Sequence, residues 1–554
     1  MMMPHRALLA LVAAFAFVAC AKKSDAPRTP ASVEAADIDA ASPLDRPYRA
    51  KGGEALDIDR LFEIFPLYLR PTYAKSDFDK KTGATVVADL EFGGEKGFRA
   101  KRAEFYGVDL DRIERVKSAE NAALDAPMEP VIAKLRLYDI ESVDGDEPGG
   151  VTIKAAEVDA LRIRQGGVPK ESAASGLAAF FNAFDVAGVY FKDVRATGAD
   201  ETRSDTGAAF DFEAADLRLV GVGGGRVDAV VARDVGYIVR QSSSAIAAAG
   251  KGLGPAGEML LKGPLRNFIA PENQRVKAKS LEWRNISFAG LMQYGLKGER
   301  PPISARDLID LGTARLVDTE TFFGDKRVSI VPQTDISAME FDWFAPSKIR
   351  AVTRGGLYDF TGYVPDTEEK AIAELKSRKL DRVKADSDLA FDWSAETGAA
   401  VFSTGFDSSG LADLDIDVAL DGLELKRIEA ARLAGARNAA SELARLKRFS
   451  FVIADEQMLD AFYALSALQT GGEAKDVRAA TPALMRLTQL ELKRSNPRVA
   501  SYIDALADFL EDGGTLEVKA EPETPVPLEA LGAAAAGGPD AMAAAVNLTV
   551  TRKK

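Results

Sequence analysis

The chain has 554 residues, of which 47% are hydrophobic and 28% charged, and its formal net charge is -13. This composition is typical of soluble globular domains, and an acidic chain lacks the basic surface that nucleic-acid binding requires. The single histidine is His5 and the single cysteine is Cys20. From residue 21 onward there is therefore no side chain for Ser-His-Asp or Cys-His catalysis, or for a metal centre built on imidazole or thiolate. We predict no enzyme activity, cofactor, metal site or nucleic-acid partner.

Residues 1–19 have the features of a signal peptide. Arg6 precedes an apolar run at 7–18, which as a helix would be about 18 Å long, too short for a bilayer core of about 30 Å. Residues 17–20 read FVAC, which resembles the lipobox of bacterial lipoprotein precursors. The resemblance implies cleavage before Cys20 and attachment of fatty acyl chains, such as palmitate, to that residue. The alternative is an ordinary signal peptide cleaved near Cys20.

The residue after Cys20 bears on localisation. In the lipoproteins that the leader resembles, aspartate at this position favours retention in the inner membrane, and here the residue is Ala21. We therefore expect a protein anchored in the outer membrane on its periplasmic face. Its expected partners are the membrane, through the lipid on Cys20, and envelope proteins or lipids.

Residues 20–55 contain many small, proline and charged residues without apolar periodicity, which predicts a flexible linker. A short amphipathic helix is expected from Leu56 to Phe65. Apolar and polar residues then alternate in many short segments up to residue 365, which predicts a β-rich region of one or more domains whose strands have one wet face. Several of these strands lead into short helical patches, without a fixed period.

A charged helix at 366–384, with a capping box formed by Asp366 and Glu369, is expected to separate this region from the rest. Residues 366–554 are predicted to form an α+β C-terminal domain, with a meander, a long helix at 424–446 and mostly helices thereafter. The fold class is thus α+β, with extended, mainly antiparallel sheets flanked by helices and more helix towards the C-terminus. The mature region is similar to uncharacterised β-rich periplasmic envelope proteins, including AsmA-type ones. It shares no motif with them from which a functional residue can be transferred.

Three motifs could carry chemistry, and each has a structural interpretation that we favour. Residues 252–257 match G-x-G-x-x-G, but a dinucleotide site needs a strand before the motif and a helix after it, so a loop is predicted. Asp413, Asp415 and Asp417 resemble the start of a calcium loop, yet Val418 occupies the position that requires glycine, so an acidic strand face is predicted. A basic segment at 426–448 could contact anionic lipid, although a solvated helix is the simpler interpretation.

The three tryptophans, Trp283, Trp343 and Trp393, each follow an acidic residue in an expected strand. We predict that they are core or sheet-face residues rather than a stacking platform for a ligand.

We expect a lipid-anchored envelope protein with a non-enzymatic binding or structural role. One alternative is a carrier with a groove for a hydrophobic envelope ligand such as a lipid. Another is a hydrolase that depends on two carboxylates, since glycoside hydrolysis needs no histidine. A continuous apolar surface along the sheet would favour the carrier, and two buried carboxylates converging in a cleft would favour the hydrolase.

Overall fold

The structure is a computed structural model that describes most of the chain after residue 33. The described residues are 34–50, 52–65, 70–93, 97–118, 126–142, 149–164, 182–199, 209–240, 273–436 and 438–554. The predicted signal peptide with Cys20 and the glycine motif at 252–257 lie outside them. The described part of the chain divides into two compact units, each with most of its contacts within itself. The first unit ends at Gly324 and the second begins at Asp325. The predicted boundary after residue 365 falls inside the second unit.

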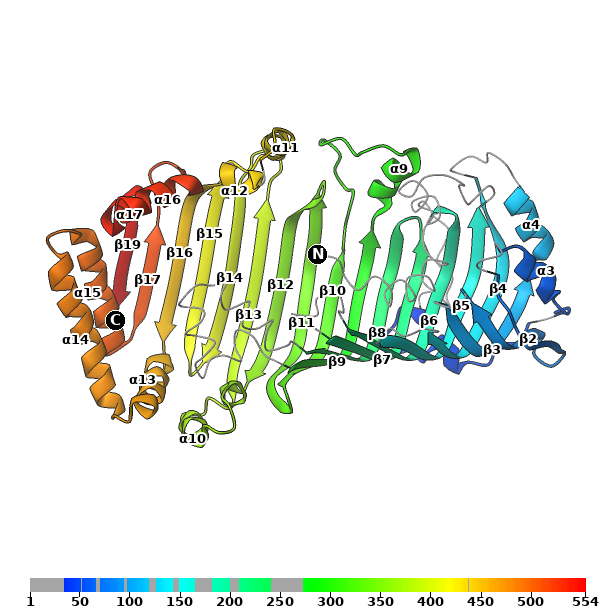
Figure 1. Ribbon diagram of the computed structural model, residues 1–554, viewed down its shortest axis with the longest axis horizontal. Coiled ribbons are helices and arrows are strands. Elements are labelled where there is room, and N and C mark those ends of the chain that lie inside the picture. Colours follow the sequence, from blue (N-terminus) through cyan, green and yellow to red (C-terminus); the bar gives the residue numbers. More distant parts are fainter. Residues whose placement is uncertain are drawn as a thin grey trace. The chain divides into compact units, whose positions relative to one another are not determined.

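The first unit is an antiparallel meander in which each strand pairs with the next strand along the chain (Figure 1). Most of its strands have 15 or 16 residues, far longer than the short segments predicted. The strands are β1 (Lys75–Asp79), β2 (Ala84–Phe92), β3 (Phe98–Val108), β4 (Met128–Ser142), β5 (Gly149–Arg164), β6 (Phe184–Ala199), β7 (Ala209–Gly223), β8 (Arg226–Arg240), β9 (Asn273–Ser287) and β10 (Thr313–Phe323).

Few helices accompany these strands in the described part of the first unit. They are η1 (Pro43–Asp45), α3 (Ile58–Glu63), α4 (Leu110–Ser118) and α9 (Ala289–Lys297). The helix predicted from Leu56 is confirmed as α3. Its N-cap is Asp57, whose side chain accepts a hydrogen bond from the backbone N–H of Arg60.

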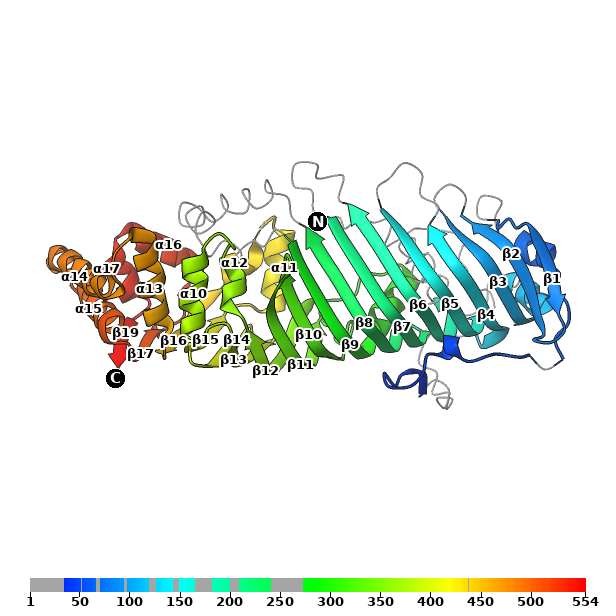
Figure 2. The same ribbon diagram turned by 90° about the horizontal axis from the view of Figure 1, so that it is seen from below.

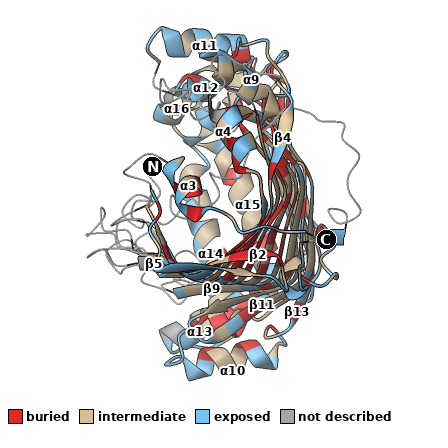
Figure 3. Cartoon of the chain, turned by 90° about the vertical axis from the view of Figure 1, so that its right-hand side faces the viewer, coloured by how far each residue is buried: buried red, intermediate tan, exposed pale blue. Residues whose placement is uncertain are grey.

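Each strand from β2 to β10 contains one residue in the left-handed conformation, and these residues form two rows across the first unit. One row runs along β2, β4, β6, β8 and β10, and consists of Asp89, Asp139, Asp193, Asp234 and Asp318, each with φ near +50°. The other runs along β3, β5, β7 and β9, and consists of Gly107, Ala160, Gly221 and Asn285. At each row the pairing omits one or two residue pairs and then resumes, as on either side of Asp139, where one pair is omitted. Figure 3 shows the resulting bend in the strands.

Each left-handed residue also shifts the alternation of side chains. Leu137 and Ile140, on either side of Tyr138 and Asp139, belong to the same apolar cluster, as do Phe191 and Val194. In a regular strand, residues three apart would point to opposite faces. The rows therefore bend the strands while keeping one face apolar along their length.

Asp139→Val is expected to lower the free energy of unfolding by about 1–2 kcal/mol, because a β-branched residue is strained at positive φ. Asp139→Gly should leave stability nearly unchanged, since glycine adopts this conformation without a steric penalty. Lys154→Val, at an exposed position on the neighbouring strand, is the control and should change stability by less than about 0.5 kcal/mol. Denaturant unfolding measures all three. Equal stability of the valine and glycine variants would contradict the role assigned to Asp139.

The apolar cluster along β3 to β8 lies on the same face of the first unit as α3 and α4. Leu61 and Phe62 of α3 pack in a second cluster that contains strand residues of β2 to β5. The two clusters share Leu137 and Leu161, so they occupy one face. Figure 3 places α3 and α4 on the inner side of the bend. We call this the inner face, and the opposite side of the same strands the outer face.

The second unit is also antiparallel. Strands β11 to β16 pair in chain order, β16 then pairs with both β17 and β18, and β17 pairs with β19. The strands are β11 (Lys326–Asp342), β12 (Ala345–Tyr358), β13 (Val383–Trp393), β14 (Ala400–Ser409), β15 (Ala412–Asp421), β16 (Arg445–Asp455), β17 (Thr515–Ala520), β18 (Val526–Pro527) and β19 (Leu548–Lys553).

Helices are concentrated in this unit, and more so towards its end, as predicted (Figure 1). They are η5 (Phe360–Tyr363), α10 (Glu369–Ser377), α11 (Leu425–Leu433), α12 (Ala439–Leu443), α13 (Met458–Thr470), α14 (Ala474–Leu492), α15 (Pro497–Asp512), α16 (Leu528–Ala536) and α17 (Pro539–Ala545). Leu459 and Tyr463 of α13 and Phe509 of α15 pack on Leu516 of β17 in one of the buried apolar clusters of this unit.

Two helix predictions in the second unit need correction. The single helix predicted at 424–446 is wrong, because α11 and α12 are separate and Gly435 has a positive φ between them. Helix α10 is shorter than the predicted 366–384 and has no side-chain cap. Asp366, the expected capping residue, instead pairs with Lys326.

Candidate functional site

Residues 34–50 pack on the outer face of the first unit. Ala35 and Ser42 are only 3% and 2% exposed. Ala35 clusters with Tyr190 and Val231, and Tyr190 lies between Val189 and Phe191 of the inner-face cluster. Because adjacent residues of a strand point to opposite faces, the segment covers the face opposite to the apolar one. The flexible linker predicted for 20–55 is therefore wrong for this segment, which Figure 2 shows below the strands.

Arginines from three strands hold this segment through its backbone carbonyls. Arg218 of β7 is fully buried and donates to the carbonyl oxygens of Asp37 at 2.9 Å and Ala40 at 2.7 Å. Arg284 of β9 donates to Ala36 O at 2.7 Å, and Arg136 of β4 to Arg46 O at 2.8 Å. The charge of Arg218 is balanced by Asp216, 2.7 Å away. The segment thus satisfies donors that would otherwise be buried without partners.

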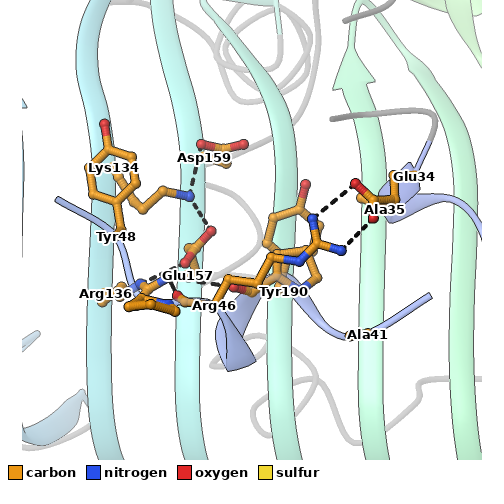
Figure 4. Close-up of a pocket in the computed structure, with 12 residues that line it drawn as sticks. Glu34, Ala35, Ala41, Arg46, Tyr48, Lys134, Arg136, Glu157, Asp159 and Tyr190 are labelled. Atoms are coloured by element: carbon orange, nitrogen blue, oxygen red, sulfur yellow. Dashed lines mark hydrogen bonds and ion pairs between the residues drawn. The ribbon is translucent and has the colours of Figure 1, made fainter. Parts of the chain in front are cut away.

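A cavity of about 240 Å³ lies between residues 34–48 and strands β4 to β6 (Figure 4). At its centre is Glu157, which is 0% exposed and accepts hydrogen bonds from Lys134 and, at 2.7 Å, from Arg136. The Lys134 ammonium also lies 3.0 Å from Asp159 and 5.0 Å from the centre of the Tyr48 ring. The strands set this geometry, because Lys134 and Arg136 are two apart on β4 and point to the same face.

Tyrosines line and border this cavity. Burial, more than neighbouring carboxylates, raises the pKa of Tyr190 well above its ordinary range. The same cause, supported by a hydrogen bond that its hydroxyl donates to Glu104 at 2.9 Å, raises the pKa of Tyr106. Tyr138 also donates to Glu104. These phenols therefore stay neutral, and those of Tyr106 and Tyr138 act as hydrogen-bond donors.

The charges around the cavity cancel. Three cations, Lys134, Arg136 and Arg46, face three anions, Glu157, Asp159 and Glu34, and Arg46 pairs with Glu34 through a hydrogen bond of 2.9 Å. Glu157 is fully buried, and both of its hydrogen-bond donors, Lys134 and Arg136, lie on the strand that neighbours its own. The cluster is thus organised as a junction that holds residues 34–50 rather than as an acid–base pair.

Two other carboxylates are perturbed by burial, one in each unit. Burial raises the pKa of Asp185 on β6, against the effect of Arg162 and Arg164, and Asp228 raises it further. Burial also raises the pKa of Asp455 at the end of β16, opposed by the backbone N–H of Leu459, which donates to it at 2.9 Å. Sequence reasoning did not select either residue, because nothing in their neighbours distinguishes them from other strand aspartates.

The inner face is the second candidate surface. Among the described residues, its cluster over β3 to β8 is made of strand side chains, including Ala156, Val189, Phe191 and Val194, each of which is 6% exposed or less. Half-buried side chains, among them Leu217 and Leu219, extend the apolar surface. Across β2 to β5 the surface continues beneath α3 and α4. Apolar residues therefore cover this face from β2 to β8.

The sequence-predicted candidates have the following positions. Trp343 and Trp393 are buried, and half-buried Trp283 donates to Leu311 O at 2.5 Å, which confirms that they are core or sheet-face residues. Asp413, Asp415 and Asp417 lie on strand β15, as predicted.

The described basic residues of 426–448 are divided between α11 and β16, so they do not form one helical surface, and Arg437 lies outside the described residues. In the described part of the chain, no cluster of three or more aspartates, glutamates, histidines or cysteines is placed to hold a metal ion. No helix there has the length and apolar character to span a bilayer.

Comparison with known proteins adds one match. Residues 405–553, which include most of the helices of the second unit, match a family model described as an uncharacterized protein. No curated protein matches the chain.

Proposed function

We propose that this chain is a lipid-anchored envelope protein of the outer membrane, facing the periplasm. Its role is non-enzymatic: the first unit binds a hydrophobic ligand, such as the acyl chains of a lipid, on its inner face. The observation that supports this most is the apolar inner face from β2 to β8.

The energetics suit an acyl chain. Each methylene group removed from water contributes about 0.8 kcal/mol, so a chain lying across several strands gains affinity without specific polar contacts. The anchor on Cys20 would keep the sheet close to a source of such chains.

The packing of residues 34–50 limits how far the sheet is from the anchor. Residue 34 is 14 positions after Cys20 (34 − 20), and a fully extended chain of that length spans about 48 Å. A linker free up to residue 55 would reach more than twice as far. The arginine contacts therefore keep the first unit close to the membrane that holds the lipid on Cys20. This favours binding of a ligand at the membrane surface over its transfer across a long distance.

The proposal predicts that the purified mature protein binds a fluorescent fatty acid. Leu217→Lys combined with Leu219→Lys should weaken binding at least tenfold, because the charges would have to be buried against the chain. Thr152→Lys is the matched control, since exposed Thr152 lies between two inner-face residues and points to the outer face. Circular dichroism checks that all variants are folded. Absence of binding, or equal affinity of all three proteins, would refute the carrier role.

The anchoring part is tested separately by fractionation. Cys20→Ser should release the protein from membranes or leave it as an unprocessed precursor, because no acyl chain can be attached. If the variant matured normally and stayed with the membranes, the lipid anchor would be refuted while the binding result would stand.

A further inference from the structure

Helix α14 has an apolar stripe that is exposed to solvent. Leu484, Leu487 and Leu490 are 64%, 61% and 63% exposed, and Ala480 and Ala483 on the same side are also exposed. Three leucines this exposed on one helix face stand out in a chain whose large apolar residues are mostly covered.

The opposite side of α14 is already occupied. Arg486 pairs with Asp508 at 2.8 Å and Glu511 at 2.6 Å on α15, and Arg478 pairs with Asp460 at 2.6 Å on α13. Buried Pro482 lies on this inward side. The stripe is therefore not the side by which α14 joins its own unit.

The spacing of the stripe is that of a helix–helix seam. Ala480 and Leu487 are seven residues apart, as are Ala483 and Leu490, which is the heptad repeat of a and d positions in a coiled coil. The alanines are small enough for a second helix to approach closely.

We infer that α14 pairs with α14 of a second copy of this chain, in antiparallel orientation. Asp476 lies near the start of the helix and Lys493 and Arg494 just after its end, each about 14 Å from residue 485 at 1.5 Å per residue. An antiparallel crossing near Leu484 and Leu487 places Asp476 of each helix beside Lys493 and Arg494 of the other. A parallel crossing would bring like charges together. The pairing is isologous, as in most homodimers.

Sedimentation velocity of the mature full chain with Cys20→Ser, which carries no lipid, tests this pairing. We expect a dimer, and we expect Leu484→Glu with Leu487→Glu to raise its dissociation constant at least tenfold, equivalent to about 1.4 kcal/mol. Asp476→Lys should weaken the dimer, and adding Lys493→Glu and Arg494→Glu should restore it. Leu487→Cys would be the only cysteine and should form a disulfide-linked dimer on oxidation, whereas Glu523→Cys, at an exposed position away from α14, should not.

Three results would overturn the inference. The chain could stay monomeric up to about 100 µM. The double glutamate variant could dimerise as well as the parent. The parent could bind vesicles with anionic phospholipid as a monomer and lose that binding in the double variant, which would make the stripe a membrane contact instead.

Discussion

Glu157→Gln is expected to lower the free energy of unfolding of the first unit by about 3–5 kcal/mol, the usual cost of removing one partner from a buried ion pair. Glu157 is fully buried between Lys134 and Arg136, and both cations are less than 10% exposed. Glutamine keeps the shape of the side chain but removes the anion that pairs with Arg136 and leaves Lys134 with Asp159.

Glu91→Gln is the matched control, because Glu91 also pairs with a cation across neighbouring strands, but both partners are almost half exposed. Its removal should cost about 0–1 kcal/mol. Denaturant unfolding monitored by tryptophan fluorescence and circular dichroism gives both values. A similar decrease in the free energy of unfolding for Glu157→Gln and Glu91→Gln would show that the Glu157 cluster is solvated. It would also show that the cluster does not hold residues 34–50.

Arg218→Met is expected to release residues 34–50 from the outer face. Methionine fills much of the same space but donates no hydrogen bond, so the carbonyls of Asp37 and Ala40 lose their donor. Asp216 would also keep only Arg233 as a cation partner, at 2.6 Å. Each hydrogen bond from a charged group contributes about 1.5–3 kcal/mol. The free energy that favours the packed over the released state of residues 34–50 should therefore fall by several kcal/mol.

Limited trypsin digestion measures this release at the bond after Arg49. Cleavage follows the population of the open form when opening is fast, and each 1.4 kcal/mol changes that population tenfold, so we expect cleavage to be faster by at least about a hundredfold. Arg240→Met, at an exposed arginine paired with Asp211 on the same strands, should leave the rate unchanged. An unchanged rate in Arg218→Met would mean that apolar packing alone holds the segment.

Some features of this protein follow from local sequence. Period-two alternation correctly predicted antiparallel strands in both units, because a half-buried strand must alternate wherever it is regular. The start of α3 follows from Asp57 as an N-cap, and Trp283 and Trp393 follow from their place in strands, whereas Trp343 lies in the turn after β11. These features depend on contacts near in sequence.

The length of the strands was not predicted, because the left-handed aspartates interrupt the alternation. At 137–140 and 191–194 an apolar residue is followed three positions later by another, with aspartate just before the second. This apolar-x-Asp-apolar pattern marks a bend, since aspartate tolerates positive φ. In the sequence it looks like the end of one strand, so each long strand was divided.

The sequence alone thus determined the class of the protein: an acidic, β-rich chain whose part after residue 20 lacks histidine and thiol chemistry, with more helix towards its end. The tertiary structure decided the role of the arginines. Arg136 and Arg218 each stand between leucines in an alternating strand, where arginine normally faces water. They are buried because residues 34–50 return over strands about 90 to 180 positions away and offer carbonyl acceptors. No local pattern encodes that pairing, because it depends on two segments that meet only in the folded chain.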